Sequence, residues 1–220
     1  LIAGAALGEA GPAEPERIEG VAHIGQGGVD EWATGVAYFA GTGRSAITEL
    51  DRQIRAYAAG EELVCEAYPH QIALNVLPQI GSLKPQMPGY TSEEAKMLFE
   101  TRKILGTDSI RVSATCVRVP VFYGHAEALN IEFERPVSVS EAREILEKAS
   151  GVQVLDDVSE REYPMPLDSA GKDDVFVGRI RPDASAENGL ALFVAGDNIR
   201  KGAALNAVQI AEALIARRPA

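Results

Sequence analysis

The chain has 220 residues, 46% of them hydrophobic and 24% charged, with a net charge of −11 at pH 7. This length can bury one good core, or one domain and part of another. The acidic balance argues against a nucleic-acid surface, which needs a basic stripe. No apolar run approaches the roughly 20 residues of a membrane span. We therefore expect neither nucleic acid nor a membrane as a partner.

The two cysteines, Cys65 and Cys116, are too few for a disulfide framework and fit a reducing, cytoplasmic location. The chain starts at Leu1 and carries no signal-peptide pattern. We interpret it as a piece of a longer chain.

Residues 1–35 show no periodic pattern, and we expect them to be irregular. The glycine cluster at residues 25–28 lacks the spacing of a phosphate-binding loop. A linker is therefore favoured over a nucleotide loop. His23 has no ligand-like neighbours, so a structural role is favoured for it.

The next segments predict a helix and then a strand. A glycine turn at residues 41–43 opens a helix with apolar residues at helical spacing, and Gly60 is its expected stop. Ile72, Leu74 and Val76 alternate as the residues of a strand do, and Pro78 would end that strand.

A second helix is predicted from a capping box at Thr91–Glu94 to about Leu105, with Gly106 as its stop. Glu100 and Lys103 stand three apart and share a face of this helix. Their spacing alone favours a surface ion pair. The functional reading is a ligand clamp, in which the lysine meets an anion and the glutamate an ammonium group.

A strand of small and β-branched residues begins at Val112 and leads to two ionisable residues, Arg118 and His125. A buried arginine needs an anion, from the protein or from a ligand, and histidine can transfer a proton near neutrality. The two residues have opposite parity, so a straight strand would point them apart, and Gly124 offers a bend that could bring them together. Cys116 lies inside the strand and is interpreted as a core residue.

The remaining chain predicts strands and helices in mixed order. A strand is expected at residues 128–133, a capped helix from Ser138 through Ala149, and a short strand at 152–155.

Adjacent strands or a hairpin are expected at residues 175–180 and 189–195, followed by a helix from about Leu205. The N-terminus of that last helix, beside Arg200 and Lys201, fits an anion site and an ordinary cap equally well. The mixed order favours an α+β sheet domain.

Five segments together resemble the bacterial aspartate-semialdehyde dehydrogenase family, and the resemblance covers about residues 40–215. It implies an α+β fold like the C-terminal domain of glyceraldehyde-3-phosphate dehydrogenase, a mixed sheet with helices packed on one face. It also implies a substrate-binding and dimerisation domain at residues 36–195 and, at 196–220, a helix that would pack on an NADP domain. The five segments are Asn75–Ile80, Phe99–Gly106, Ser113–His125, Tyr163–Asp168 and Asp197–Ala211.

The family reduces L-aspartyl-4-phosphate with NADPH to L-aspartate 4-semialdehyde and phosphate, on the diaminopimelate route to lysine and on the routes to methionine and threonine. A cysteine thiolate forms a thioester, NADPH delivers hydride and a histidine handles the proton. The resemblance thus implies an NADP-dependent oxidoreductase that acts as a homodimer on these small molecules.

Carried onto the matching positions, the resemblance implies a role for five residues. His125 corresponds to the acid/base, and Arg118 to the group that binds the substrate carboxylate. Glu100 and Lys103 correspond to the clamp for the substrate ammonium and phosphate. Asn198 corresponds to a late NADP contact, and no metal is implied.

The chain also departs from the family pattern. The 220 residues hold neither the family's Asn-Cys-Ser/Thr-Thr nucleophile motif nor its Gly-x-x-Gly-x-x-Gly nucleotide loop, and Ala37 stands where a glutamine is expected. We therefore expect no turnover from these residues alone. Two alternatives stay open: an inactive dimerisation or partner-binding paralogue that keeps the fold, and a related reductase such as N-acetyl-glutamyl-phosphate reductase.

Overall fold

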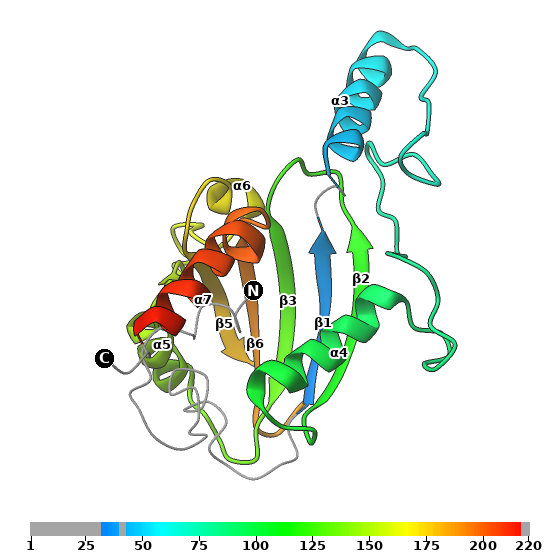
Figure 1. Ribbon diagram of the computed structural model, residues 1–220. Helices are drawn as coiled ribbons and strands as arrows, with labels where there is room; N and C mark the ends of the chain where they lie inside the picture. The colour runs from blue at the N-terminus through cyan, green and yellow to red at the C-terminus, as the bar shows by residue number, and fades with distance from the viewer. Residues whose placement is uncertain (1–31, 40–42, 217–220) are drawn as a thin grey trace.

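The computed structural model describes residues 32–39 and 43–216. Six strands form one mixed sheet in the order β2-β1-β3-β6-β5-β4 (Figure 1). β1 and β2 run parallel, β3 is antiparallel to β1 and β6, and β4 runs parallel to β5, which is antiparallel to β6. The predicted α+β class is confirmed. The strands are β1 (Trp32–Phe39), β2 (Arg111–Arg118), β3 (His125–Glu132), β4 (Val152–Val154), β5 (Val175–Pro182) and β6 (Gly189–Gly196).

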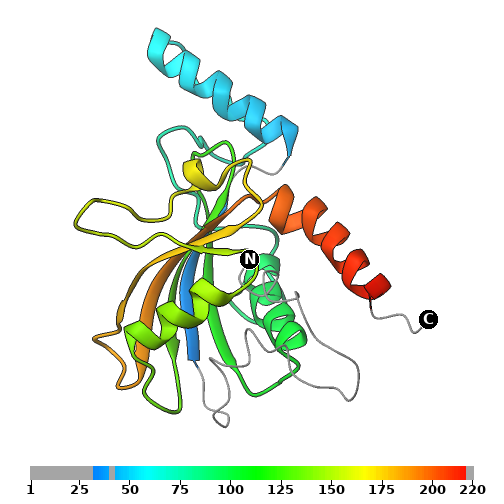
Figure 2. The same cartoon turned by 90° about the vertical axis from the view of Figure 1, so that its left-hand side faces the viewer.

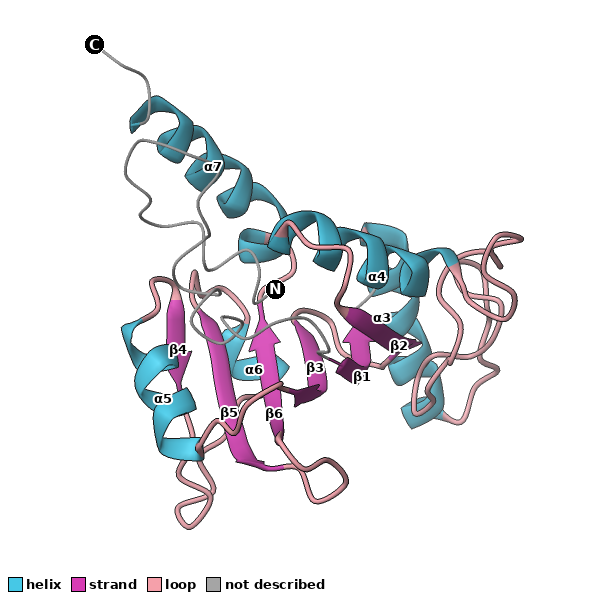
Figure 3. Ribbon diagram, turned by 90° about the horizontal axis from the view of Figure 1, so that it is seen from below, coloured by secondary structure: helices cyan, strands magenta, loops and turns pink. Residues whose placement is uncertain are grey.

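Helices lie along the sheet and project beyond it. α4 crosses β1 and β2 (Figure 1), and α7 lies on the same side of the sheet (Figure 3). α3 and α7 extend away from the sheet (Figure 2), and α3 packs against the segment that follows it, through Ala46 and Leu50. The helical elements are α3 (Arg44–Ala59), α4 (Ser92–Leu105), α5 (Val139–Lys148), the short α6 (Pro166–Ser169), the π-helical turn η1 (Arg200–Ala204) and α7 (Leu205–Ala216).

The predicted capping box starts α4. The Oγ1 atom of Thr91 accepts from the N–H of Glu94, and the Glu94 carboxylate accepts from the N–H of Thr91 at 2.8 Å. At α5 the Ser138 hydroxyl accepts from the N–H of Glu141, while the Glu141 carboxylate contacts Arg135. The bonds from the N–H groups of Thr91, Glu94 and Glu141 each satisfy a backbone donor that a helix start would otherwise leave unpaired.

The strand register shows that α4 and α5 pack on one face of the sheet. Cys116, Glu127 and Val194 lie in one row across β2, β1, β3 and β6. Residues in one row project to the same face. Cys116 packs with Met97 of α4, and Val194 belongs to the cluster that contains Leu146 of α5. The fold prediction of helices on one face is therefore confirmed.

Two secondary-structure predictions need correction. The segment at residues 72–76 is not a strand, because Leu74 has a left-handed φ of 59° and the chain turns there. Only Leu77 pairs with the sheet, in an isolated bridge to Arg118. The N-terminal segment was expected to be irregular through residue 35, but β1 begins at Trp32 and lies between β2 and β3.

Candidate functional site

Arg118 and His125 lie at the same edge of the sheet, where β2 and β6 end and β3 begins. Arg118 pairs with Phe39 of β1, and His125 pairs with Gly196 of β6. Since Tyr38 pairs with Ala126, the register continues to place His125 beside Phe39. Arg118 and His125 thus occupy one row, about 10 Å apart across two strand spacings, and both project to the face that α4 and α5 cover.

This row corrects the parity argument made from the sequence. The chain leaves β2 after Arg118 and re-enters the sheet two positions away, on the other side of β1. Residue counting across that loop does not determine the face, because the two residues belong to different strands. Gly124 does adopt a bent, left-handed conformation with φ 87°, but the strand register sets the common face.

Arg118 is only 8% exposed. Its backbone N–H donates to the carbonyl of Leu77 at 2.9 Å, and its carbonyl accepts from the N–H of Leu77 at 3.0 Å. Burial lowers the pKa of the Arg118 guanidinium, while the fields of Tyr68 and Glu93 act in the opposite direction. The side chain is a cation held in a partly desolvated place, which suits a small anionic ligand.

His125 is half-buried beside this cation. Burial, and after it the positive charge of Arg118, lower the pKa of its imidazole to about 4, while the carboxylate of Asp197 acts in the opposite direction. At pH 7 the ring is therefore neutral. In that state it can accept a proton and then return it, which is what a general base does.

One stripe of alternating charge runs along α4, from Glu93 and Lys96 to Glu100 and Lys103. Both pairs have the same spacing of three residues, so spacing could not distinguish them. The Nζ atom of Lys96 lies 3.1 Å from the carboxylate of Glu93. Glu93 is the member of the stripe whose field reaches Arg118. The structure thus brings the first pair, and not the predicted second pair, toward the edge with Arg118.

Glu100 and Lys103 are exposed farther along α4. Arg102, beside Lys103, donates from Nε to the carbonyl of Ile110 at 3.0 Å. Ile110 precedes β2, and about 26 Å of extended strand separate it from Arg118 at 3.3 Å per residue. Lys103 therefore lies toward the opposite end of β2. The sequence did not single out Glu93 and Lys96, because their spacing equals that of Glu100 and Lys103 and the antiparallel course of α4 along β2 cannot be read from it.

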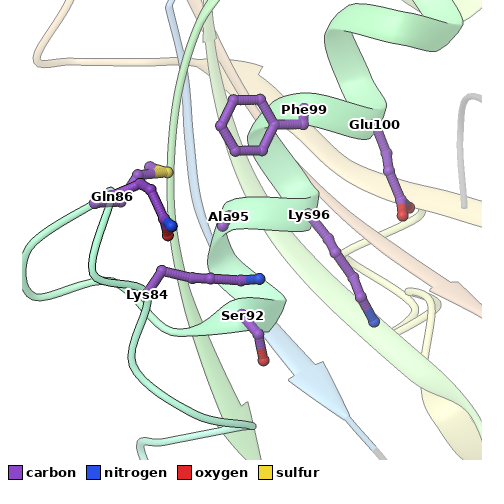
Figure 4. A pocket seen from close by; sticks show the side chains of 8 residues that line it. Lys84, Gln86, Ser92, Ala95, Lys96, Phe99 and Glu100 are labelled. Carbon is purple, nitrogen blue, oxygen red and sulfur yellow. The ribbon is translucent and has the colours of Figure 1, made fainter.

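A hollow of about 450 Å³ lies between α4 and the loop that precedes it (Figure 4). Phe99 points from the helix over the hollow, and Lys84 reaches toward the helix from the loop. Lys96 and Glu100 extend in a common direction along the helix flank. The lining residues are Lys84, Gln86, Met87, Ser92, Ala95, Lys96, Phe99 and Glu100.

Asn198 lies at the same sheet edge, just after β6. Its Oδ1 atom accepts a hydrogen bond of 3.0 Å from the N–H of Gly124, the residue before His125. The structure therefore brings Asn198 together with Arg118 and His125. The amide nitrogen of Asn198 still carries two N–H donors that a ligand could use.

An ordinary cap is present at the beginning of the last helical segment. The Asp197 carboxylate accepts from the N–H groups of Ile199 and Arg200 at 2.7 and 2.8 Å. Arg200 donates to Asp173 at 2.6 Å, and Lys201 is buried with its Nζ atom 2.7 Å from Gln209. The alternative of an anion site here, considered from the sequence, does not hold, because protein acceptors engage these donors.

The two cysteines differ in environment. Cys116 is fully buried, and burial together with nearby carboxylates, Glu94 first, raises the pKa of its thiol to about 12. The interpretation of Cys116 as a core residue is confirmed, because a thiol of this pKa stays protonated. Cys65 is exposed in the loop after α3.

Within residues 32–39 and 43–216, no group of three or more His, Cys, Asp or Glu residues could hold a metal ion. None of the helices described there combines the length and the apolar character that crossing a membrane requires.

Comparisons with known proteins show the family to which the chain belongs. Residues 31–201 match the family model described as semialdehyde dehydrogenase, dimerisation domain. The chain is 53% identical over 176 residues to an aspartate-semialdehyde dehydrogenase of Aquifex aeolicus, covering 80% of this chain and 51% of that protein. The chain spans about half the length of the curated relatives it matches.

Solved structures with the same fold carry related descriptions. Aspartate semialdehyde dehydrogenase II from Vibrio cholerae, also solved in complex with ASA, has a TM-score of 0.79 at 41% identity, covering 84% of this chain and 55% of that one. A Candida albicans aspartate semialdehyde dehydrogenase solved with NADP has a TM-score of 0.61 at 26% identity, covering 90% and 53%.

Proposed function

The chain belongs to the semialdehyde dehydrogenase dimerisation-domain family, and from that premise we propose that it is the substrate-binding part of an aspartate-semialdehyde dehydrogenase. The whole enzyme would reduce L-aspartyl-4-phosphate to L-aspartate 4-semialdehyde in the synthesis of lysine, methionine and threonine. The observation that carries the proposal is the row that places Arg118 and His125 on one face at one sheet edge.

Arg118 would bind the substrate carboxylate. A guanidinium offers two parallel N–H donors to a carboxylate, and partial desolvation strengthens such a pair. Its backbone is held by the bridge to Leu77, so the point from which the side chain extends is fixed before substrate arrives. This preorganisation reduces the entropy lost on binding.

Glu93 and Lys96 would hold the substrate's ammonium and phosphate groups. The carboxylate and the ammonium group of this pair lie 3.1 Å apart, on the part of α4 nearest Arg118. Glu100 and Lys103, inferred from the resemblance, stay a prediction for the same role. The geometry favours the first pair.

His125 would move the proton of the reaction. Its neutral imidazole can accept a proton at pH 7 and give it back. NADPH would supply the hydride in the whole enzyme. The half-buried amide of Asn198, at the same edge as His125, fits a polar group of that cofactor through its N–H donors.

The domain plan follows from the same premise. Residues 36–195 would form the substrate-binding and dimerisation domain, and residues 196–220 a helix against the NADP-binding part. We propose that the protein is a homodimer in the cytoplasm. The oligomeric state of the chain in solution tests this. Sedimentation should show a dimer at micromolar concentration.

Calorimetric titration of the chain with L-aspartate 4-semialdehyde in phosphate buffer tests the proposal. Arg118→Ala should weaken binding about 10- to 100-fold, which corresponds to one lost charge-assisted hydrogen bond. Arg111→Ala at the exposed other end of β2 is the matched control and should leave binding unchanged. Equal binding by both variants, or none by the parent chain, would contradict the proposal.

An inactive paralogue is the second candidate. The observation that favours it is Ala37, which lies in β1 where the family resemblance expects a glutamine. Such a protein would dimerise without binding the semialdehyde, so the same titration separates the two functions. The chain alone should give no phosphate-dependent NADP reduction in either case.

A further inference from the structure

The chain enters β3 through a loop with few attachments. From His125 onward, β3 is bonded to β1 on one side and β6 on the other. Residues 119–124 lie outside the sheet, and the N–H of Val121 bonds only locally, to the carbonyl of Val119. The course of the chain into His125 therefore depends on what fixes Gly124, the residue just before it.

Gly124 is fixed from two sides. Its left-handed φ of 87° brings it so close to α6 that an added Cβ atom would stand 2.8 Å from the carbonyl oxygen of Pro166. On another side, its N–H donates to Oδ1 of Asn198, which is 74 residues away in sequence. Among residues 119–124, it is the one hydrogen bond in the described structure that reaches a residue distant in sequence.

Asn198 is itself held firmly. The preceding Asp197 is 5% exposed, and its carboxylate accepts from the N–H groups of Ile199, Arg200 and Gly171. The backbone around Asn198 is thereby tied to the end of β6, to the beginning of η1 and to the segment after α6. Its amide oxygen is a fixed acceptor rather than a mobile surface group.

We propose that Asn198 is a positioning residue for His125, which holds the imidazole in place by anchoring Gly124. This role differs from a cofactor contact, because it uses the amide oxygen and leaves the amide N–H groups for other partners. This proposal rests on the proposed function in one respect, that His125 moves the proton of the reaction. The anchoring itself is a property of the chain.

Without the anchor, the loop before β3 could move away and water could reach the imidazole. Among the described residues, the charged groups whose fields act on His125 are Arg118 from β2 and Asp197 from the end of β6. Neither is altered by a change at Asn198. A shift in the titration of His125 would therefore report hydration and position of the ring.

The test is an NMR titration of the histidine side chains in the full chain, with hydrogen exchange of the Gly124 N–H. In Asn198→Ala the midpoint of His125 should rise from about 4 by about one pH unit or more, and the Gly124 N–H should lose protection. Asn198→Asp keeps an oxygen acceptor and should keep that protection. Asn188→Ala, at the far end of β6, is the control and should change neither quantity.

An unchanged His125 midpoint with unchanged Gly124 protection in Asn198→Ala would overturn the proposal. If Asn198→Ala fails to fold, loss of Gly124 protection in a folded Asn198→Asp would overturn it equally. The titration reads the ring directly, so this result is separate from substrate binding. Failure of the proposed function would instead appear as absent semialdehyde binding while Asn198 still controls the ring.

Discussion

Leu77 and Arg118 exchange two backbone hydrogen bonds of 3.0 and 2.9 Å, which attach an otherwise irregular segment to the end of β2. The segment is held at its other end by Gln53 of α3, whose Oε1 atom accepts from the N–H groups of Ile72 and Ala73 at 3.0 Å each. α3 is thus connected to the arginine of the site through one short stretch of chain.

Gln53→Leu should destabilise the chain by about 2–4 kcal/mol, because it leaves two buried backbone donors without acceptors. Gln53 is fully buried, so no water can replace its oxygen without rearrangement. Urea unfolding of the variant measures the loss. Gln79→Leu, at an exposed position, is the control and should change stability little. A similar small effect at both positions would show that the bonds of Gln53 are not needed.

The stability of the chain should depend on His125 below pH 6.5. The folded-state pKa of about 4 lies under the ordinary value of 6.5, so the unfolded chain binds the proton more readily. The contribution of the neutral ring is complete above pH 6.5 and is lost as pH falls toward 4, by up to about 3 kcal/mol. The His125→Gln variant should lack this part of the pH dependence. The control variant His70→Gln, at an exposed position, should keep the pH dependence of the parent chain. Parallel pH profiles for parent and His125→Gln would refute the expectation.

The two charge pairs of α4 should differ in function. Lys96→Ala should weaken phosphate-dependent semialdehyde binding about 10-fold or more, since a charge-assisted contact is lost. Lys103→Ala should have a small effect, because Lys103 lies toward the far end of β2. Calorimetry on both variants decides between the pairs. The reverse order of effects would favour the pair inferred from the family resemblance.

Gly124→Ala should cost more stability than Gly106→Ala. Both glycines have a left-handed φ, which costs an alanine about 1–2 kcal/mol. A Cβ at Gly106 would meet nothing within 4 Å, whereas one at Gly124 would meet Pro166. Overpacking should add about 1–3 kcal/mol at Gly124. Thermal and urea unfolding compare the two, and equal losses would mean that the Pro166 contact yields freely.

Local signals in the sequence predicted the helices well. The capping residues Thr91 and Ser138 and the stops at Gly60 and Gly106 act within a few residues, so their meaning does not depend on the rest of the fold. The paired strands β5 and β6 were predicted for the same reason, from continuous apolar runs.

Alternation alone was misleading at residues 72–76. Leu74 and Val76 are 67% and 49% exposed. These two apolar side chains therefore do not form the buried face of a strand. The order of the strands was equally beyond local signals. β1 joins the sheet between β2 and β3, which follow it at a distance in sequence, and the placement of Arg118, His125 and Glu93 depends on that order.

The spacing of Arg118 and His125 cannot be adjusted gradually. It is set by the intervening strand β1, and neighbouring strands stand about 4.8 Å apart whatever side chains they carry. Point mutations leave such a backbone interval unchanged, and inserting or removing a strand would disrupt the domain. Ligands of another length would therefore have to be accommodated from elsewhere, by residues on α4 and in the loops. The distance between the two residues on the sheet can change only by whole strand spacings. Selection for a new substrate would therefore act on the residues around them.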